Sequence, residues 1–393
     1  MNRNVLSLGF VVLSAWAAAV HAEGRKLTVD DFEDGDRRAA SGLSWISIAD
    51  DLTGGASFAD LEVTGAGGGS GRALRVSGEV AADGFAGAWV ALDGGARATD
   101  VSDFKGLRLR VRGPGALKVL LRGGPGAGFS YAAPVESRAD WTTVEVPFQA
   151  LTAARPGSPA FDPRTVRWLG VGVSANRAGR YEFAIDDVEL YAARDDARLR
   201  VQAGPPLAVA FGTAPDAERP AGPWKELARD APDDGKQKRL PDATALAVCA
   251  DEPHGRVWFR IALSGPLPTR WLGVNLALDI DGDPDNGMAW WGTNKAFRFD
   301  RLVTVYGSAT ESGYEGTIGI ADAAEVQAGN MLGSQGDVVR LILDHADPAF
   351  LVGIPARALG TSTRGPVRLV AAVGSAFQHN DDVPDEGAAV VAR

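Results

Sequence analysis

Four aspartates alternate along one short segment in the second half of the chain, within the sequence DIDGDPDNG. These residues are Asp279, Asp281, Asp283 and Asp285. Carboxylates at this spacing suit a hard cation such as Ca²⁺, which takes about six to eight oxygen ligands. Counted from Asp281, Asn286 and Gly292 occupy the positions where an EF-hand loop has its Gly and its bidentate Glu. The segment therefore predicts a structural calcium site of another kind or, alternatively, a solvated acidic turn.

Tryptophans are the second group that could bind a ligand, because a flat indole packs against the C–H face of a sugar ring. Trp290 and Trp291 follow the acidic segment directly. Adjacent residues of a strand point to opposite faces, so at least one should leave the core unless the pair lies in a loop. Trp271, Asn294 and Lys295 could join them as a further aromatic group and a polar rim. The alternative is that these tryptophans belong to the core.

Motifs of common catalytic sites are absent from the sequence, which has no G-x-S-x-G, no H-E-x-x-H and no P-loop. The Gly-rich stretch 64–72 precedes a strand pattern and opens no helix, so we expect no nucleotide site. His254, His345 and His379 are tied to no nucleophile by a motif, and we expect no haem. The sequence therefore predicts a protein that is not an enzyme.

Strands must position these groups, because short runs of alternating apolar and polar residues fill both halves of the 393-residue chain. In LRLRVR (107–112) the apolar side chains face one way and three Arg face the other, as in a half-buried antiparallel strand. A polar segment, 193–206, ends in Pro-Pro and predicts a linker between domains 23–192 and 207–393. We expect an all-β fold.

Residues 1–22 have the pattern of a secretory signal peptide. Arg3 supplies the positive charge, an apolar region follows, and Val20-His21-Ala22 resembles a cleavage site. We expect cleavage after Ala22, export to the periplasm or beyond, and no membrane span in the mature chain; the alternative is an N-terminal membrane anchor. The net charge of −10, without a basic cluster, argues against binding of nucleic acid.

The first half contains a series of segments whose order is informative. They are DDFEDGD (30–36), Trp45, DDLTGGAS (50–57), GRALRVSGEV (71–80), DGFAGAWVAL (83–92), DVSDFKGLRLRVRGPG (100–115), DWTTVEVPF (140–148), VRWLGVGVS (166–174) and YEFAIDDVELY (181–191). This order resembles the complex I intermediate-associated protein 30 family and its relative, carbohydrate-binding module family 11. The resemblance covers about residues 27–192 and implies a galactose-binding-like β-jelly-roll.

The same resemblance implies a structural Ca²⁺ that bridges the first and last strands of this domain. Its ligands would be Asp31, Glu33, Asp186 and Asp187. Carboxylates on adjacent strands repel unless a cation or an Arg neutralises them, so the alternatives are exposed or Arg-paired side chains. The strand alternation also allows a concave binding face that contains Trp89, Arg122 and Tyr131.

The second half contains a further set of segments: PDATALAVCADEPHGRVWFRIALSG (241–265), GVNLALDIDGDPDNG (273–287), YEGTIGI (314–320) and NDDVPDEG (380–387). They resemble carbohydrate-binding module family 9 and the related DOMON-like sandwiches over residues 207–393. This implies a second β-sandwich after the jelly-roll.

Two binding-type folds without a catalytic motif predict an exported, non-catalytic protein that binds a glycan and contains structural calcium. The alternative is an envelope protein-interaction or assembly factor, whose partner would be another protein. A third reading is a carbohydrate-active enzyme with an unrecognised acid pair. Fold class alone does not choose among these functions.

Overall fold

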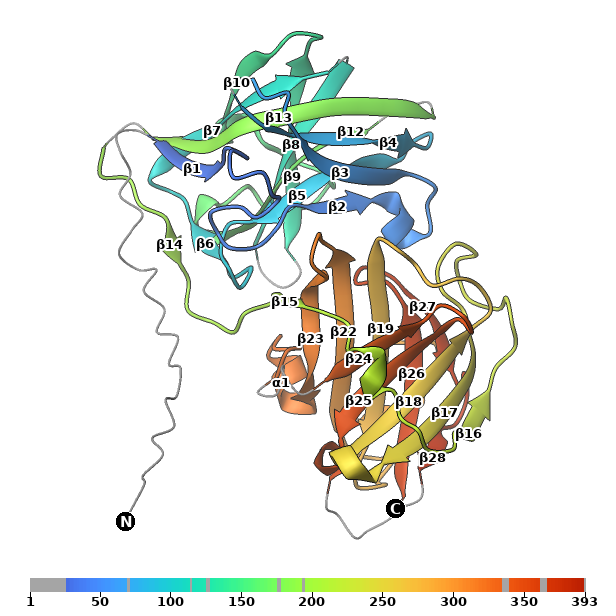
Figure 1. The fold of residues 1–393 in the computed structure, drawn as a ribbon. Helices are drawn as coiled ribbons and strands as arrows, with labels where there is room; N and C mark the ends of the chain where they lie inside the picture. The colour runs from blue at the N-terminus through green and yellow to red at the C-terminus, as the bar shows by residue number, and fades with distance from the viewer. Residues whose placement is uncertain are drawn as a thin grey trace, which may run out of the picture.

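The computed structural model describes residues 26–391 except 69–70, 114, 125–127, 175–177, 193–194, 334–338 and 361–365. The predicted signal peptide, residues 1–22, lies outside the described residues. The described chain forms two β-sandwiches, one at each end of the molecule (Figure 1). The expectation of an all-β fold is confirmed.

The first domain is a sandwich of two antiparallel sheets. One sheet has the order β10 (Thr142–Pro147), β7 (Phe104–Arg112), β13 (Gly179–Ala192), β4 (Ala73–Val80), β3 (Phe58–Thr64), with β1 (Lys26–Asp30) also paired to β13. The other has the order β11 (Thr152–Ala153), β9 (Phe129–Ser137), β8 (Gly115–Gly123), β12 (Val166–Ser174), β5 (Phe85–Ala91), β2 (Ile46–Ala49), with β6 (Thr99–Asp100) paired to β12 and to β14 (Arg200–Val201). Short helical turns are η2 (Asp50–Thr53), η3 (Phe148–Ala150) and η4 (Pro163–Thr165). The chain passes repeatedly between the sheets, which is the predicted jelly-roll.

Alternation explains the strands of this domain. In β7, Leu107, Leu109 and Val111 are buried in the core, whereas Arg108 and Arg110 are half-buried on the outer face. The strand pairs antiparallel with β10 on one side and with β13 on the other. The half-buried antiparallel strand predicted from LRLRVR is therefore confirmed.

The second domain is also a two-sheet sandwich. One sheet has the order β15 (Val209–Phe211), β23 (Tyr314–Asp322), β22 (Arg301–Ala309), β19 (Trp271–Asp279), β26 (Val367–Gly374), β27 (His379–Val383), with β28 (Ala389–Val391) paired to β26. The other has the order β16 (Lys225–Arg229), β17 (Ala243–Asp251), β18 (Arg256–Leu263), β25 (Ala349–Pro355), β24 (Arg340–Asp344). Smaller elements are the pair β20 (Met288–Ala289) and β21 (Arg298–Phe299), helix α1 (Ala323–Gln327), and the turns η5 (Asp216–Glu218), η6 (Glu252–His254) and η8 (Ala356–Leu359).

The central strand β19 is buried along its whole length. One face lies in the main core of the sandwich, where Leu276 packs. The other face, with Ala277, is covered by a smaller cluster that includes Trp290 and Phe299. The core therefore fixes the position of both ends of β19. The strand begins at Trp271 and ends at Asp279, two residues that the sequence identified as candidate site residues.

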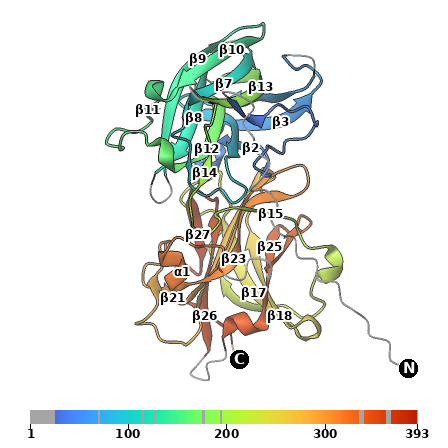
Figure 2. The same cartoon turned by 90° about the vertical axis from the view of Figure 1, so that its left-hand side faces the viewer.

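The two domains contact each other beyond the connecting segment. Part of the predicted linker, β14, pairs with β6 of the first domain, and β15 then joins the second domain (Figure 2). Glu315 of β23 accepts hydrogen bonds from the backbone and the side chain of Ser44, at 2.7 and 2.8 Å. The Ser375 hydroxyl donates to the carbonyl of Leu52. These buried polar contacts connect the two sandwiches.

Candidate functional site

A cavity of about 540 Å³ lies where the two domains meet. The first domain contributes Asp51, from η2. The second domain contributes the loop between β16 and β17 and the turn between β18 and β19, which ends at Trp271. Small-molecule sites commonly enclose about 300–1,000 Å³ and gather at domain boundaries. The cavity therefore has the size and the position of a ligand site.

Trp271 connects the walls of the cavity. Its Nε1 atom donates a 3.2 Å hydrogen bond to Oδ2 of Asp51. The indole is only 6% exposed and packs with Leu52, Leu240 and Ile48. Burial raises the pKa of Asp51, although the Trp271 hydrogen bond acts in the opposite direction. The predicted ligand residue Trp271 thus lines a cavity, but it offers an edge of its ring rather than an open face.

The lining of the cavity contains charges of both signs and hydroxyl groups. Its acidic members are Asp51, Asp233 and Asp242, its basic members are Lys238, Arg239 and Arg270, and its hydroxyl groups belong to Ser264 and Thr269. Arg270 is positioned by the first domain, because its Nε lies 3.3 Å from Asp60 and its guanidinium lies 4.5 Å over the ring of Phe58. Such a lining offers both donors and acceptors to a polar ligand.

Strand β27 and Asp242 fix the loop between β16 and β17. Asp242 accepts hydrogen bonds from the backbone of Asp233 and of Gly235, at 2.7 and 2.8 Å. Asn380 accepts from the backbone of Gln237 at 2.7 Å and donates to the carbonyl of Pro241 at 2.9 Å. The wall of the cavity is therefore built from a loop that depends on β27.

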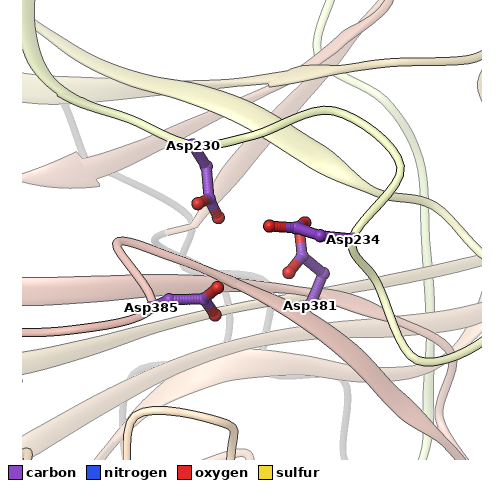
Figure 3. Close-up of side chains that lie close together, drawn as sticks. All are labelled: Asp230, Asp234, Asp381 and Asp385. Atoms are coloured by element: carbon purple, nitrogen blue, oxygen red, sulfur yellow. The ribbon is translucent and has the colours of Figure 1, made fainter.

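The same loop contributes to an acidic cluster, shown in Figure 3. It consists of Asp230, Asp234, Asp381 and Asp385, each of which places one carboxylate oxygen within 4.8 Å of the others. Asp381 is 2% exposed, Asp230 and Asp385 are half-buried and Asp234 is exposed. Burial, together with neighbouring aspartates, raises the pKa of Asp381 to about 8 and that of Asp230 to about 6. None of these four residues was predicted from the sequence to belong to a site.

Only two of the four aspartates in the predicted calcium segment lie close together in the structure. Asp279 and Asp281 lie together with Asp300, which precedes β22 and was not predicted. Asp283 and Asp285 are not in this group, and Asp283 accepts a backbone hydrogen bond from Asp285 at 3.0 Å, so their role as calcium ligands stays a prediction. Asp300 could not be found from spacing, because it reaches the cluster through the pairing of β19 with β22.

The Asp279 group already contains a positive charge. Arg368 lies 3.2 Å from Oδ2 of Asp279, whose other oxygen accepts from the backbone of Gly282 at 2.7 Å. Oδ2 of Asp300 accepts from the backbone of Ile280 at 2.9 Å. These contacts satisfy much of the group without a metal ion.

Of the predicted calcium ligands of the first domain, Asp186 and Asp187 lie on β13, and Asp31 and Glu33 follow the end of β1, which pairs with β13. They do not form a group of three within 4.8 Å among the described residues. Glu33 accepts from the backbone of Arg72 at 3.1 Å, and Asp186 accepts from the backbone of Gly68 at 2.7 Å. Asp187 lies 3.9 Å from Arg110, and Asp31 accepts from the backbone of Glu33 at 3.3 Å. Calcium bound by Asp31, Glu33, Asp186 and Asp187 stays a prediction.

The tryptophan pair does not form an open platform. Trp290 is 2% exposed, and its Nε1 donates to Oδ2 of Asp382 at 2.9 Å. The backbone of Asn294 donates to the same oxygen at 2.8 Å, and the amide side chain of Asn294 donates to the carbonyl of Gly387 at 2.9 Å. Trp291 is half-buried beside Trp290, with ring centroids 4.7 Å apart. Trp290 and Asn294 are both buried and bonded within the second domain, so neither offers an open surface, and ligand contact by these residues stays a prediction.

The three residues predicted to form a concave face of the first domain do not all lie on one surface. Trp89 is half-buried over Gly170, where a Cβ atom would lie 2.7 Å from the indole. Arg122 lies on the same outer sheet surface, 5.3 Å from the ring of Phe377 of the second domain, and its burial lowers its pKa. Tyr131 instead lies in the core, where it is 3% exposed and its hydroxyl donates to the Pro159 carbonyl at 3.2 Å, so its part in a binding face stays a prediction.

A second hollow, of about 850 Å³, is a groove along β4 and β13 of the first domain. Two of its arginines pair with its two glutamates: Arg180 lies 3.3 Å from Glu79, and Arg75 lies 3.3 Å from Glu182. Its third arginine, Arg112, lies over the ring of Trp141, 5.1 Å from the centroid. The groove is larger than the cavity between the domains, but most of its charged groups are paired within its own wall.

The comparisons with known proteins concern mainly the first domain. Residues 31–185 match the family model of Complex I intermediate-associated protein 30 (CIA30). The first domain is similar to this family. The predicted resemblance is thereby confirmed for the first domain, whereas that of the second domain to family 9 modules stays a prediction. No curated protein matches the chain.

Solved structures with similarity to the chain include two family 11 carbohydrate-binding modules from Clostridium thermocellum. One, from a cellulosomal cellulase, is 18% identical, with 43% of this chain and 95% of that chain covered and a TM-score of 0.35. The other, in complex with a β-1,3-1,4-mixed-linked tetrasaccharide, is 17% identical, with 44% and 98% covered and a TM-score of 0.35. A β-1,2-glucanase from Parabacteroides distasonis is 10% identical, with 91% and 38% covered and a TM-score of 0.30.

The CIA30 match includes only one wall of the cavity between the domains. Asp51 lies within the matched residues, whereas Trp271 and the loop between β16 and β17 lie outside them. In the part of the chain that the structure describes, no helix is long and apolar enough to cross a membrane.

Proposed function

We propose that this protein is an exported, non-catalytic carbohydrate-binding protein, and that the cavity between its domains is the glycan site. The carrying observation is the mixed lining of the cavity, in which acidic, basic and hydroxyl groups surround the buried edge of Trp271. A sugar hydroxyl both donates and accepts hydrogen bonds, so it matches a wall that offers carboxylates beside guanidinium groups.

The apolar part of the wall would receive the C–H face of the sugar. Leu240, Pro266 and Pro268 lie around the cavity next to Trp271. Asp51 of the first domain would accept hydrogen bonds from the sugar hydroxyls, and Arg270 of the second domain would donate to them. Because Asp51 belongs to the first domain and the rest to the second, ligand affinity would depend on the contact between the domains.

Export is supported by the signal-peptide pattern of residues 1–22. Calcium in a structural role is supported by the acidic cluster of Asp230, Asp234, Asp381 and Asp385. An exported protein meets glycans of the cell envelope or of the surroundings, which agrees with the proposed ligand class.

The test is a titration of the mature chain, residues 23–393, with a panel of soluble oligosaccharides and polysaccharides in an isothermal calorimeter. We expect a selective ligand whose affinity falls about 10-fold or more in Arg270→Ala, equivalent to about 1.4 kcal/mol. Arg180→Ala is the matched control, because this arginine lies in the groove of the first domain and is 89% exposed. Loss of affinity in the control instead would move the site to the groove, and absence of binding across the panel would contradict the proposal.

The CIA30 match favours a second candidate function, that of an envelope protein-interaction or assembly factor. A stoichiometric protein that co-purifies with the chain from its envelope, together with no response to the glycan panel, would support this candidate. Release of reducing sugar from a polysaccharide would instead identify the chain as an enzyme.

A further inference from the structure

Two carboxylate oxygens of the acidic cluster beside the cavity have no hydrogen-bond partner. They are Oδ2 of Asp230 and Oδ1 of Asp385, and both are inaccessible to solvent. Figure 3 shows the four carboxylates of the cluster directed toward one another from two stretches of the chain, 230–234 and 381–385. An unpartnered buried carboxylate oxygen is costly in free energy, so its presence points to a ligand that it contacts.

The hydrogen bonds of Asp230 and Asp381 each use only one of the two carboxylate oxygens. Oδ1 of Asp230 accepts from the backbone of Ala231 at 3.1 Å, and Oδ2 of Asp381 accepts from the backbone of Ala243 at 2.8 Å. Each of these carboxylates therefore keeps its second oxygen for another partner. The side chain of Asp381 is 2% exposed, so this partner must be enclosed by the protein.

Positive charge that could neutralise the cluster is not in contact with it. Among the described residues, no Lys, Arg or His forms an ion pair with any of the four aspartates. Lys236 and His379 act on Asp385 from a distance, but the Lys236 ammonium donates its hydrogen bond to Nδ1 of His379, at 2.9 Å. Four carboxylates within 4.8 Å repel one another strongly when ionised. A bound cation would remove this repulsion.

We propose that Asp230, Asp234, Asp381 and Asp385 bind one calcium ion. All four ligands are hard carboxylate oxygens without a nitrogen or sulfur donor, which favours Ca²⁺ or Mg²⁺ over zinc or copper. Ca²⁺ accepts irregular sets of about six to eight oxygens, whereas Mg²⁺ demands an octahedral set. Ligands from a loop, a strand and the turn after that strand form an irregular set, so calcium fits better.

The proposed ion would also act on the cavity between the domains. Asp234 lies in the loop between β16 and β17, and its neighbours Asp233 and Gly235 line the cavity. A Ca²⁺ ion that joins this loop to β27 would therefore fix one wall of the proposed glycan site. This consequence rests on the proposed function, whereas the ion site itself does not.

The experiment measures binding of CaCl₂ to the metal-free mature chain by calorimetry, and the melting temperature in EDTA and in CaCl₂. We expect one tight site per chain, with Ca²⁺ preferred over MgCl₂. Asp385→Asn should weaken Ca²⁺ binding at least 10-fold. Asp234→Asn should do the same, and because Asp234 is exposed, this variant keeps the test independent of folding. Asp283→Asn, in the predicted calcium segment but outside either cluster, is the matched control and should bind like the wild type.

The change in melting temperature caused by Asp385→Asn shows whether Asp385 binds the ion or only stabilises the fold. In EDTA, Asp385→Asn should melt at a higher temperature than the wild type, because one of the repelling charges is gone. In CaCl₂ the order should reverse, because only the wild type gains the full stabilisation from the ion. No Ca²⁺ binding by the wild type, or equal binding by Asp385→Asn, Asp234→Asn and the wild type, would overturn the proposal. These outcomes are read without any sugar, so they are separate from failure of the glycan site.

Discussion

The Nε1 atom of Trp271 donates a hydrogen bond to Asp51, and this contact crosses from the second domain to the first. Trp271 begins the central strand β19, which is buried along its whole length, so the indole extends from the core of its domain. Asp51 lies in the short turn η2 of the other domain. This contact between a core strand and a surface turn is thus one of those that join the two walls of the cavity.

Trp271→Phe should lower the free energy of unfolding by about 1–3 kcal/mol, because it leaves the half-buried carboxylate of Asp51 without its indole donor. Urea denaturation followed by circular dichroism measures this change. Adding Asp51→Asn to Trp271→Phe should recover part of the loss, since a neutral side chain is less costly to bury. Equal stability of the wild type and Trp271→Phe would show that the contact does not stabilise the folded chain.

Glu315→Ala should destabilise the contact between the domains by about 2–3 kcal/mol, because both carboxylate oxygens accept hydrogen bonds from Ser44 and the residue is 6% exposed. Scanning calorimetry should then resolve two unfolding transitions, one for each sandwich. Glu311→Ala is the control: its ion pair with Arg37 also crosses between the domains, but Glu311 is 51% exposed. Such an exposed pair contributes at most about 1 kcal/mol. A single unchanged transition in Glu315→Ala would contradict this account.

Asp30 predicts a dependence of stability on pH. Burial raises the pKa of Asp30 to about 7, although Phe32 and Trp45 donate hydrogen bonds to it. Below pH ~4 both the folded and the unfolded chain keep the proton. Between pH ~4 and ~7 the unfolded chain loses it first, so the free energy of unfolding falls as the pH rises, by at most about 4 kcal/mol.

The measurement for Asp30 is a series of urea titrations in EDTA across this range of pH. Asp30→Asn does not titrate, so its stability should lose this part of the pH dependence while losing one of the two hydrogen bonds. The same slope in Asp30→Asn and in the wild type would mean that other groups cause it.

The fold could be predicted because each sandwich strand carries its own local pattern. In β7 the alternation of Leu107, Arg108 and Leu109 already separates the core face from the solvent face. Strand β19 has no such alternation, yet its short apolar run bounded by turn residues suffices. These signals are local, and the structure adds only which strands are neighbours.

The candidate sites could not be predicted to the same extent, because they join residues that are distant in sequence. Asp230 and Asp381 meet only because the loop after β16 folds onto β27. Asp51 and Trp271 meet only because the two domains pack together. In DIDGDPDNG the acidic spacing did identify Asp279 and Asp281, but their third partner, Asp300, comes from the start of the paired strand. The spacing of residues along the chain does not predict which distant residues come together.

The tryptophan pair shows the same limit and gives the last prediction. Alternation indicates that Trp290 and Trp291 differ in direction, but not which of them is buried. The structure buries Trp290 against Asp382, which is fully buried. Burial alone would raise the pKa of Asp382, but hydrogen bonds from His379, Asn294 and Trp290 lower it, so the carboxylate is ionised and depends on its donors.

Trp290→Phe should therefore destabilise the second domain by about 1–3 kcal/mol, because it removes one donor from a buried ionised carboxylate. Trp291→Phe should cost less than about 1 kcal/mol, since Trp291 is half-buried and its ring can be replaced by another aromatic ring. Urea denaturation of both variants checks the order of the two losses. Neither variant should change the affinity for a glycan, because both tryptophans lie outside the lining of the cavity. Loss of glycan affinity in Trp291→Phe with unchanged stability would instead make this ring the binding surface.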